Sequence, residues 1–160
     1  MKYAAIFMVL VLIASLVGVG YLYLTANVTV QAVGVTAVEA SAQPALFEEL
    51  ARQVESRQVL GTTYTSAPLG GIENYQFYTY TVRLKNSCFL AADMVELQVT
   101  PMEGDVLQIG DTSAKVLAAR TTGDIQATIL TDIGMHAVRE LNVTYYMWGL
   151  PFTLRTTYGH

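Results

Sequence analysis

The sequence predicts a mainly β protein, an antiparallel sandwich with one short helix, preceded by a single N-terminal transmembrane helix. Three observations lead to this prediction. Residues 4–24 contain no charged side chain, and residues 44–58 carry an amphipathic helical pattern. From Tyr75 onward, apolar and polar residues alternate in short segments. Turn-forming residues separate these segments about every 8–12 positions, which is typical of an antiparallel sandwich.

The apolar run from Ala4 to Leu24, AAIFMVLVLIASLVGVGYLYL, has the length of a membrane span. At about 1.5 Å per residue it extends over roughly 31 Å, close to the hydrocarbon thickness of a bilayer. Tyr21 and Tyr23 stand at its outer end, where aromatic side chains favour the headgroup region. A cleaved signal peptide has a shorter apolar core and ends in a small-x-small site, whereas Leu24-Thr25-Ala26 begins with leucine.

We therefore expect an uncleaved membrane anchor over residues 1–26. A cleaved signal and a buried helix of a soluble protein are the two alternatives. Lys2 precedes the apolar run, and the next basic residue is Arg52. By the positive-inside rule, the N-terminus is then cytoplasmic and residues 27–160 form one extracytoplasmic domain of a single-pass protein of the cell membrane.

The composition excludes several classes of partner. The chain has 13 acidic and 9 basic residues, a net charge of −4, and no run of like charge. A nucleic-acid-binding face needs clustered basic residues, so no nucleic acid is expected as a partner. Scattered charges also argue against electrostatic docking on anionic lipid. The single cysteine, Cys88, is a buried apolar residue, a free thiol or an intermolecular link.

The first part of the soluble domain predicts a strand, a helix and a loop. Residues 27–40 are rich in β-branched side chains, and a change in the phase of their apolar positions predicts a bulge at Gly34. Residues 44–58 predict the helix, with Pro44 in its first turn. Residues 59–74 contain glycine, proline and asparagine, which predict a long loop with a short strand around Thr62 to Thr65.

The second part predicts a series of strands with a two-residue period. One face of the first strand is apolar, and the later strands alternate in the same way. The apolar positions are Tyr78, Tyr80, Val82, Leu84, then Val95, Leu97, Val99, then Ile125, Ala127, Ile129, then Leu141, Val143, Tyr145 and Met147. Further short strands are expected at 106–109, 114–119 and 151–158. The segment Trp148-Gly149-Leu150-Pro151 is expected to break the pairing of the last two strands.

Residues 80–99, YTVRLKNSCFLAADMVELQV, resemble the central hairpin of bacterial cell-adhesion-related immunoglobulin-like domains. The shared pattern is a strand that ends in Lys-Asn, a small residue, an alanine, and an alternating Val-x-Leu-x-Val strand. Thr121-Thr122-Gly123-Asp124 and the following strand resemble a later step of the same domains. The resemblance implies an immunoglobulin-like sandwich with a modular binding or spacer role. It supplies no catalytic residues.

The titratable residues do not form a catalytic pattern in the sequence. His136 and His160 each lack a second histidine or cysteine at the spacing of metal ligands. Asp105, Asp111, Asp124 and Asp132 fall in or beside predicted turns, where aspartate is favoured for its local hydrogen bonds. Their alternative role is calcium binding. No enzyme activity, metal or cofactor is therefore expected.

Aromatic residues are the candidate binding residues. Neighbouring rings in Phe77-Tyr78 and Tyr145-Tyr146 point to opposite faces of a strand, so one ring of each pair is expected in the core and the other at the surface. Exposed tyrosine and tryptophan are common anchors at binding surfaces. The candidate binding residues are Tyr64, Tyr78, Tyr146, Trp148 and Phe152.

The sequence thus predicts a membrane-anchored extracytoplasmic binding or accessory domain without catalysis. Its expected partners are the membrane, through the N-terminal helix, and a protein or another component of the cell envelope. An edge strand, the long loop or the aromatic patch would make the contact. The alternative is a calcium-dependent or small enzymatic module that uses the loop carboxylates.

Overall fold

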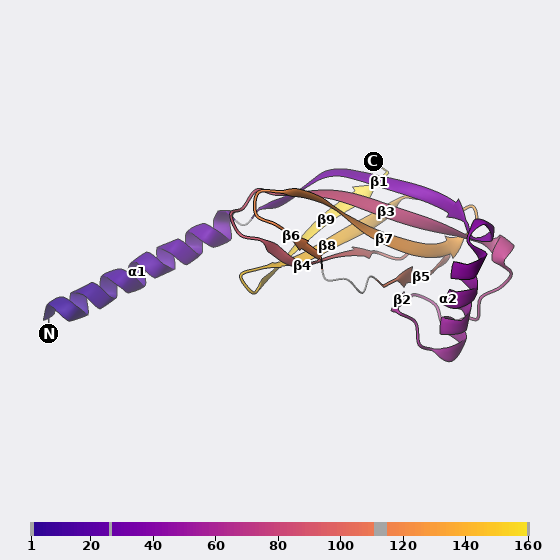
Figure 1. Ribbon diagram of the computed structural model, residues 1–160, viewed down its shortest axis with the longest axis horizontal. Helices are drawn as coiled ribbons and strands as arrows, with labels where there is room; N and C mark the ends of the chain where they lie inside the picture. Colours follow the sequence, from indigo (N-terminus) through magenta and orange to yellow (C-terminus); the bar gives the residue numbers. More distant parts are fainter. Residues whose placement is uncertain (1, 26, 111–114, 160) are drawn as a thin grey trace.

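The computed structural model describes residues 2–25, 27–110 and 115–159. Over these residues the chain from residue 27 onward is a sandwich of two antiparallel sheets, which confirms the predicted fold class (Figure 1). The first sheet has the order β1 (Val28–Glu39), β3 (Tyr75–Asn86), β7 (Thr122–Asp132), β5 (Asp105–Ile109) and β2 (Gly61–Thr63). The second has the order β6 (Lys115–Leu117), β4 (Ala92–Val99), β8 (Arg139–Met147) and β9 (Leu150–Tyr158).

The strand order is immunoglobulin-like. In the immunoglobulin sandwich, strands A-B-E-D form one sheet and C-F-G the other. Here β1-β3-β7-β5 occupy the A-B-E-D positions, and β4-β8-β9 occupy the C-F-G positions. The alternation predicted from the sequence fills the space between the sheets. Tyr80, Val82, Ile129, Leu141 and Val143 are all completely buried there.

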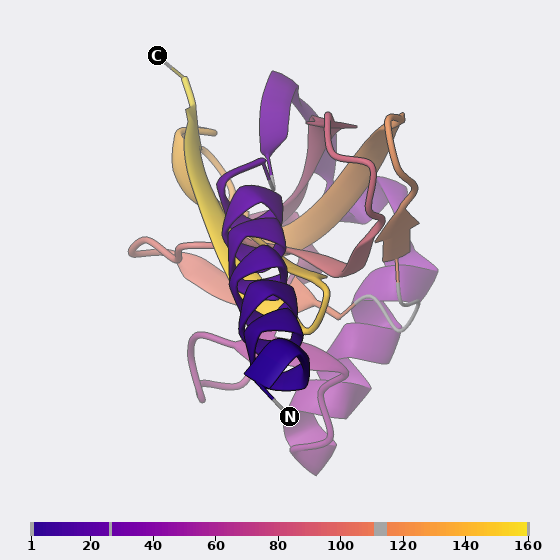
Figure 2. The same cartoon turned by 90° about the vertical axis from the view of Figure 1, so that its left-hand side faces the viewer.

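The sandwich has two ends with different attachments. Helix α1 (Lys2–Thr25) projects from one end, which we call the helix-proximal end (Figure 1). Helix α2 (Pro44–Ser56) packs at the opposite end, the distal end. Seen along α1, the sheets form two layers and α2 lies behind them (Figure 2). Two single-turn 3₁₀-helices, Ala40–Ala42 and Ile72–Asn74, also lie at the distal end.

Helix α1 is exposed along its length. Residues Tyr3–Thr25 are long and apolar enough to cross a membrane, and none of this segment is buried against the sandwich. Apolar side chains surround the helix on all sides, as expected for a helix with a lipid environment. Near its end, the Tyr23 ring contacts the Phe152 ring of β9 at a centroid distance of 5.6 Å.

Helix α2 covers a second, smaller core. Phe47 and Leu50 on α2 pack with Phe77, Leu107 and Leu130, which point away from the space between the sheets. The expectation that one residue of the Phe77-Tyr78 pair is exposed is therefore wrong, because α2 covers the face that would otherwise meet solvent. The Tyr145-Tyr146 pair behaves as expected, with Tyr145 buried and Tyr146 partly exposed.

The bulge in β1 lies elsewhere than predicted. The register between β1 and β3 shifts between Val30 and Ala32, whereas Gly34 pairs regularly with Thr81. The apolar phase of the sequence changes gradually, so it indicates that a bulge exists but does not fix its position. The segment around Trp148 is also different from the prediction. Met147 pairs with Leu150 and Tyr146 with Pro151, so Trp148 and Gly149 form a two-residue hairpin turn rather than a break.

Candidate functional site

A groove at the distal end is the candidate functional site. It has a volume of 670 Å³ and lies between the C-terminal end of α2 and the chain around β2. This volume is within the range of ligand sites in proteins. The lining residues are Val54, Arg57, Val59, Gly61, Thr63, Tyr64, Thr65 and Ser66.

Local backbone geometry forms the groove. Arg57 caps the C-terminus of α2; its backbone is left-handed with φ of 55°, and its N–H donates to the Val54 carbonyl oxygen. The side chain of Gln53 accepts a hydrogen bond from the Leu60 N–H at 3.1 Å, which turns the chain back toward the sheet. Gly61 then pairs with Ile109 at φ of 139°. A Cβ atom at Gly61 would lie 2.1 Å from the Gln108 carbonyl oxygen, so only glycine fits there.

Strand β2 gives the groove an open backbone edge. It pairs with β5 on one side and is the last strand in the order of its sheet. All of its residues, Gly61–Thr63, are exposed. Unpaired N–H and C=O groups at a sheet edge can pair with an added extended segment. The groove therefore combines backbone hydrogen-bonding groups with hydroxyl side chains and the guanidinium of Arg57.

Tyr64 joins the groove to the core. Its hydroxyl donates to the Val99 carbonyl oxygen at 3.0 Å and lies 3.1 Å from Oε1 of Gln108. Burial raises the pKa of Tyr64 to about 12, and the negative charge of Asp105 adds to this rise. The phenol is therefore neutral at physiological pH and acts as a hydrogen-bond donor. Of the predicted binding residues, Tyr64 is the one that lines the groove.

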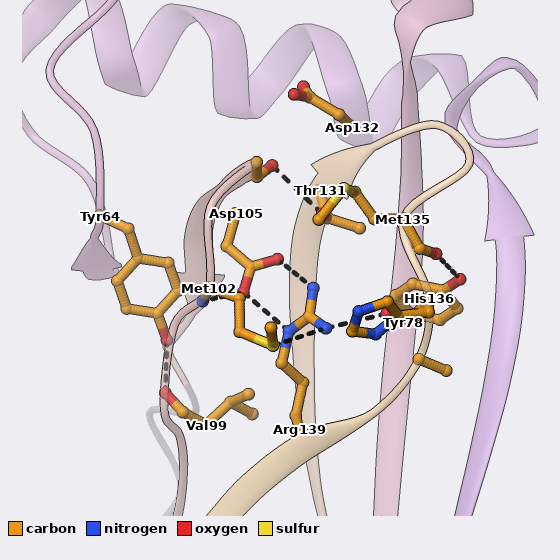
Figure 3. A network of polar contacts seen from close by, with 12 residues as sticks. Tyr64, Tyr78, Val99, Met102, Asp105, Thr131, Asp132, Met135, His136 and Arg139 are labelled. Carbon is orange, nitrogen blue, oxygen red and sulfur yellow. Dashed lines mark hydrogen bonds and ion pairs between the residues drawn. The ribbon is translucent and has the colours of Figure 1, made fainter. Parts of the chain in front are cut away.

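A buried ion pair supports the core beside the groove (Figure 3). Nε and Nη2 of Arg139 donate to the two carboxylate oxygens of Asp105 at 2.9 and 2.7 Å, and both side chains are 0% exposed. Nη1 of Arg139 donates to the carbonyl oxygens of His136 and Val138. Burial alone would lower the pKa of Arg139, but the hydrogen bonds and charge of Asp105 outweigh it, and the net shift is upward.

The other buried polar groups of this region also bind the chain itself. Tyr78 donates to the Met135 carbonyl oxygen, and Tyr80 donates to that of Ala137 at 2.9 Å. Gln108 donates to the Leu97 carbonyl oxygen and accepts from the Val99 N–H. Among the residues that the structure describes, every buried side-chain nitrogen and oxygen has a hydrogen-bond partner. These groups therefore hold the fold together.

The predicted aromatic binding residues do not form one site. Tyr64 lies at the groove, and Tyr78 is buried in the core near the distal end. Tyr146, Trp148 and Phe152 lie at the helix-proximal end on β8, the hairpin turn and β9. Phe152 is half-buried and stacks on Tyr145 at a centroid distance of 5.4 Å. Tyr146 is 39% exposed and Trp148 is 63% exposed.

The loop carboxylates do not form one group, although Asp105 and Asp132 both lie at the distal end, where Asp105 pairs with Thr131. Asp105 binds Arg139 at the distal end, and Asp124 forms a two-point hydrogen bond with Arg83 near the other end. Asp111 and His160 lie outside the described residues. Within residues 2–25, 27–110 and 115–159, no three His, Cys, Asp or Glu side chains are grouped as metal ligands. Cys88 is buried, in agreement with the first of its three alternatives.

No protein-family model matches this chain, and no curated protein is similar to it in sequence.

Two features of this region were not predicted from the sequence. The groove depends on how the end of α2 approaches β2, and a sequence pattern does not give that approach. The sequence does contain an indication of the Asp105–Arg139 pair. Asp105 precedes the apolar residues of β5, and Arg139 begins a strand of alternating apolar residues. A charged residue next to a core segment favours a buried partner of opposite charge.

Proposed function

We propose that this protein is a membrane-anchored extracytoplasmic binding domain, without catalysis, that holds an extended segment of a protein partner in the groove between α2 and β2. The observation that carries the proposal is the open edge of β2 inside this groove. The anchor would be α1, with its N-terminus in the cytoplasm. The domain would act as an accessory subunit of a complex in the cell envelope.

The position of the groove supports this proposal. The groove lies at the distal end, and α1 leaves the sandwich at the opposite end (Figure 1). A sandwich anchored through α1 would therefore present the groove away from the bilayer. Exposed residues of β2 and the following loop would then be accessible to a partner that extends from another envelope protein.

The chemistry of the groove supports binding of a peptide segment. An added strand would form backbone hydrogen bonds with β2, whose outer edge is open. Thr63, Thr65 and Ser66 supply hydroxyl groups, and Arg57 can donate to a carboxylate of the partner. The apolar side chains of Val54 and Val59 would bury part of the segment. The buried acids, bases and phenols nearby are already bonded to the domain, which favours recognition over catalysis.

Site-specific photo-crosslinking tests the proposal. A photoreactive amino acid is placed at Thr63 in the full chain, which carries a C-terminal tag and is extracted from membranes in mild detergent. A matched control carries it at Thr153, an exposed residue of β9. We expect a stoichiometric adduct of one partner from position 63 and none from position 153. A clean monomer with no adduct from either position would contradict the proposal.

A calcium titration separates the proposal from the calcium-dependent alternative. Because the loop carboxylates are spread between the two ends of the sandwich, we expect the melting temperature to be the same with calcium and with a chelator. A rise in melting temperature that saturates with calcium would instead favour the metal-dependent module.

A further inference from the structure

The helix-proximal end of the sandwich carries a group of exposed apolar side chains. Phe89 lies in the loop between β3 and β4, and Tyr146, Trp148 and Leu150 lie at the hairpin of β8 and β9. Their exposed fractions are 50%, 39%, 63% and 43%. We call these four residues the aromatic rim. Both loops point toward α1 in Figure 1.

We propose that the aromatic rim inserts into the headgroup region of the same bilayer that α1 enters, and so fixes the domain upright on the membrane. This inference rests on the membrane anchoring proposed above. The rim contacts lipid rather than a protein partner, because the connection to α1 is too short to leave space for a protein between the rim and the bilayer. Three independent features of the chain support it.

The first feature is the short connection. α1 ends at Thr25 and β1 begins at Val28. Three residue steps span at most about 11 Å between Cα atoms. The headgroup region on each side of a bilayer is roughly 5–8 Å thick. The helix-proximal loops are therefore held at the depth of the lipid headgroups, and the ring contact between Tyr23 and Phe152 joins the helix to the sandwich at this level.

The second feature is the backbone of Trp148. Trp148 and Gly149 have φ of 54° and 75°, so both residues of the two-residue turn have positive φ. Such turns favour Asn-Gly, since a bulky residue at positive φ is strained. The Trp148 ring gains little from the fold, because most of it is exposed. A strained residue that does not serve the fold indicates a function, and tryptophan is enriched at the membrane interface.

The third feature is the distribution of charge. The charged residues are scattered in the sequence, but the fold places most of the acidic ones at the distal end. Among the described residues, the helix-proximal third carries Arg83, Lys85, Lys115 and Arg120 against Asp93, Glu96 and Asp124. Apart from the buried pair, the distal end carries Glu39, Glu48, Glu49, Glu55, Glu73, Glu103, Asp132 and Glu140 against Arg52, Arg57 and Arg155. The basic end suits lipid phosphates, and the acidic end favours a position away from them.

The single tryptophan of the chain makes the proposal directly measurable. The full chain is reconstituted in phosphatidylcholine vesicles, and its fluorescence is quenched either by brominated lipid or by acrylamide in the water. We expect strong quenching of Trp148 by the lipid and weak quenching by acrylamide. Strong acrylamide quenching without lipid quenching would overturn the proposal.

Two matched variants move the tryptophan to other positions. W148N/F89W places it on a second residue of the aromatic rim, and W148N/I133W places it on an exposed residue of the distal end. Because asparagine suits the turn, we expect the melting temperature to stay the same or rise in both variants. The tryptophan at position 89 should be quenched by lipid, and that at position 133 by acrylamide. Equal behaviour at positions 89 and 133 would overturn the proposal.

Flotation of the same vesicles separates this proposal from the proposed anchor. If the protein does not float with the vesicles, the anchoring is wrong and the rim proposal falls with it. If the protein floats while Trp148 is accessible to acrylamide, the anchor stands and the docking of the rim alone is wrong.

Discussion

At the scale of single residues, the buried pair of Asp105 and Arg139 is the interaction most sensitive to change. Both charges are removed from water, and their mutual hydrogen bonds replace hydration. Removal of one partner from such a pair leaves the other charge buried without compensation. The stability of the distal end therefore depends on both residues together.

Substitution D105N tests this dependence. Asparagine keeps the size of the side chain but removes its negative charge, so Arg139 remains buried and unpaired. We expect the free energy of unfolding to fall by about 3–5 kcal/mol. Thermal unfolding followed by circular dichroism measures the change. The control is D124N, which breaks the exposed pair with Arg83 and should change stability little. Equal, small effects of both variants would contradict the prediction.

The raised pKa of Tyr64 predicts that the folded protein loses stability at alkaline pH. The folded pKa of Tyr64, about 12, is above the ordinary tyrosine value of 10.0, so the native state is stabilised as long as the phenol is neutral. This contribution is complete below pH 10 and is lost as the pH rises from about 10 to 12. Tyr80 and Tyr145 are shifted in the same direction. Absorbance at 295 nm should therefore show these tyrosines ionising later than the exposed ones.

Substitution Y64F isolates the contribution of this residue. Loss of the hydrogen bond to Val99 should cost about 1 kcal/mol at pH 8. Between pH 10 and 12, the stability of Y64F should fall less steeply than that of the native chain, because phenylalanine does not ionise. Urea unfolding at several pH values measures both effects. Parallel pH profiles of the two proteins would show that Tyr64 does not contribute to the alkaline transition.

At the scale of elements, the packing of α2 determines the shape of the groove. Phe47 is buried in the first turn of α2, and its ring centroid lies 5.6 Å from that of Tyr75. We expect F47A to lower the free energy of unfolding by about 3–5 kcal/mol, because it removes a large buried ring. The control E55A, at an exposed position of the same helix, should stay within about 0.5 kcal/mol of the native chain.

The F47A substitution should also weaken partner binding in the groove. Without Phe47, α2 keeps Leu50 and Val54 in the smaller core but packs less firmly on it, so the wall of the groove is less well fixed. We therefore expect F47A to reduce partner crosslinking from position 63 at a temperature where the sandwich remains folded. E55A should crosslink like the native chain. Unchanged crosslinking in F47A would show that α2 does not form part of the binding site.

The elements also show how far sequence patterns predict this fold. The two-residue period placed Tyr80, Val82, Leu141 and Val143 in the core correctly, because alternate residues of a strand point to opposite faces. Helix 44–58 was predicted within two residues of its observed end at Ser56. Bulge position, the burial of Phe77 and the groove were not predicted, since each depends on contacts between segments far apart in the chain.

At the scale of the whole molecule, α1 is the feature on which the proposed membrane anchoring depends. Its apolar surface is exposed and would be covered by lipid in a membrane span. Substitution of both Leu12 and Ile13 by arginine, in the middle of the helix, should make insertion less favourable by about 5–7 kcal/mol. We expect this variant to leave the membrane fraction after an alkaline wash, and the matched double alanine variant to remain.

The intact mass of the native chain tests whether the anchor is cleaved. The mass of the membrane-bound protein should include residues 1–26, whereas cleavage of a signal peptide would remove them.

Helix α1 also determines how the protein would carry tension. Strand β1 connects the end of α1 directly to the segment that continues into α2, one wall of the groove. A pull by a partner on α2 would therefore travel through the covalent backbone of β1, over roughly 40 Å for its 12 residues. The hydrogen bonds to β3 would keep this strand straight without bearing the load. The domain could thus transmit force between a partner and the membrane while the rest of the sandwich stays folded.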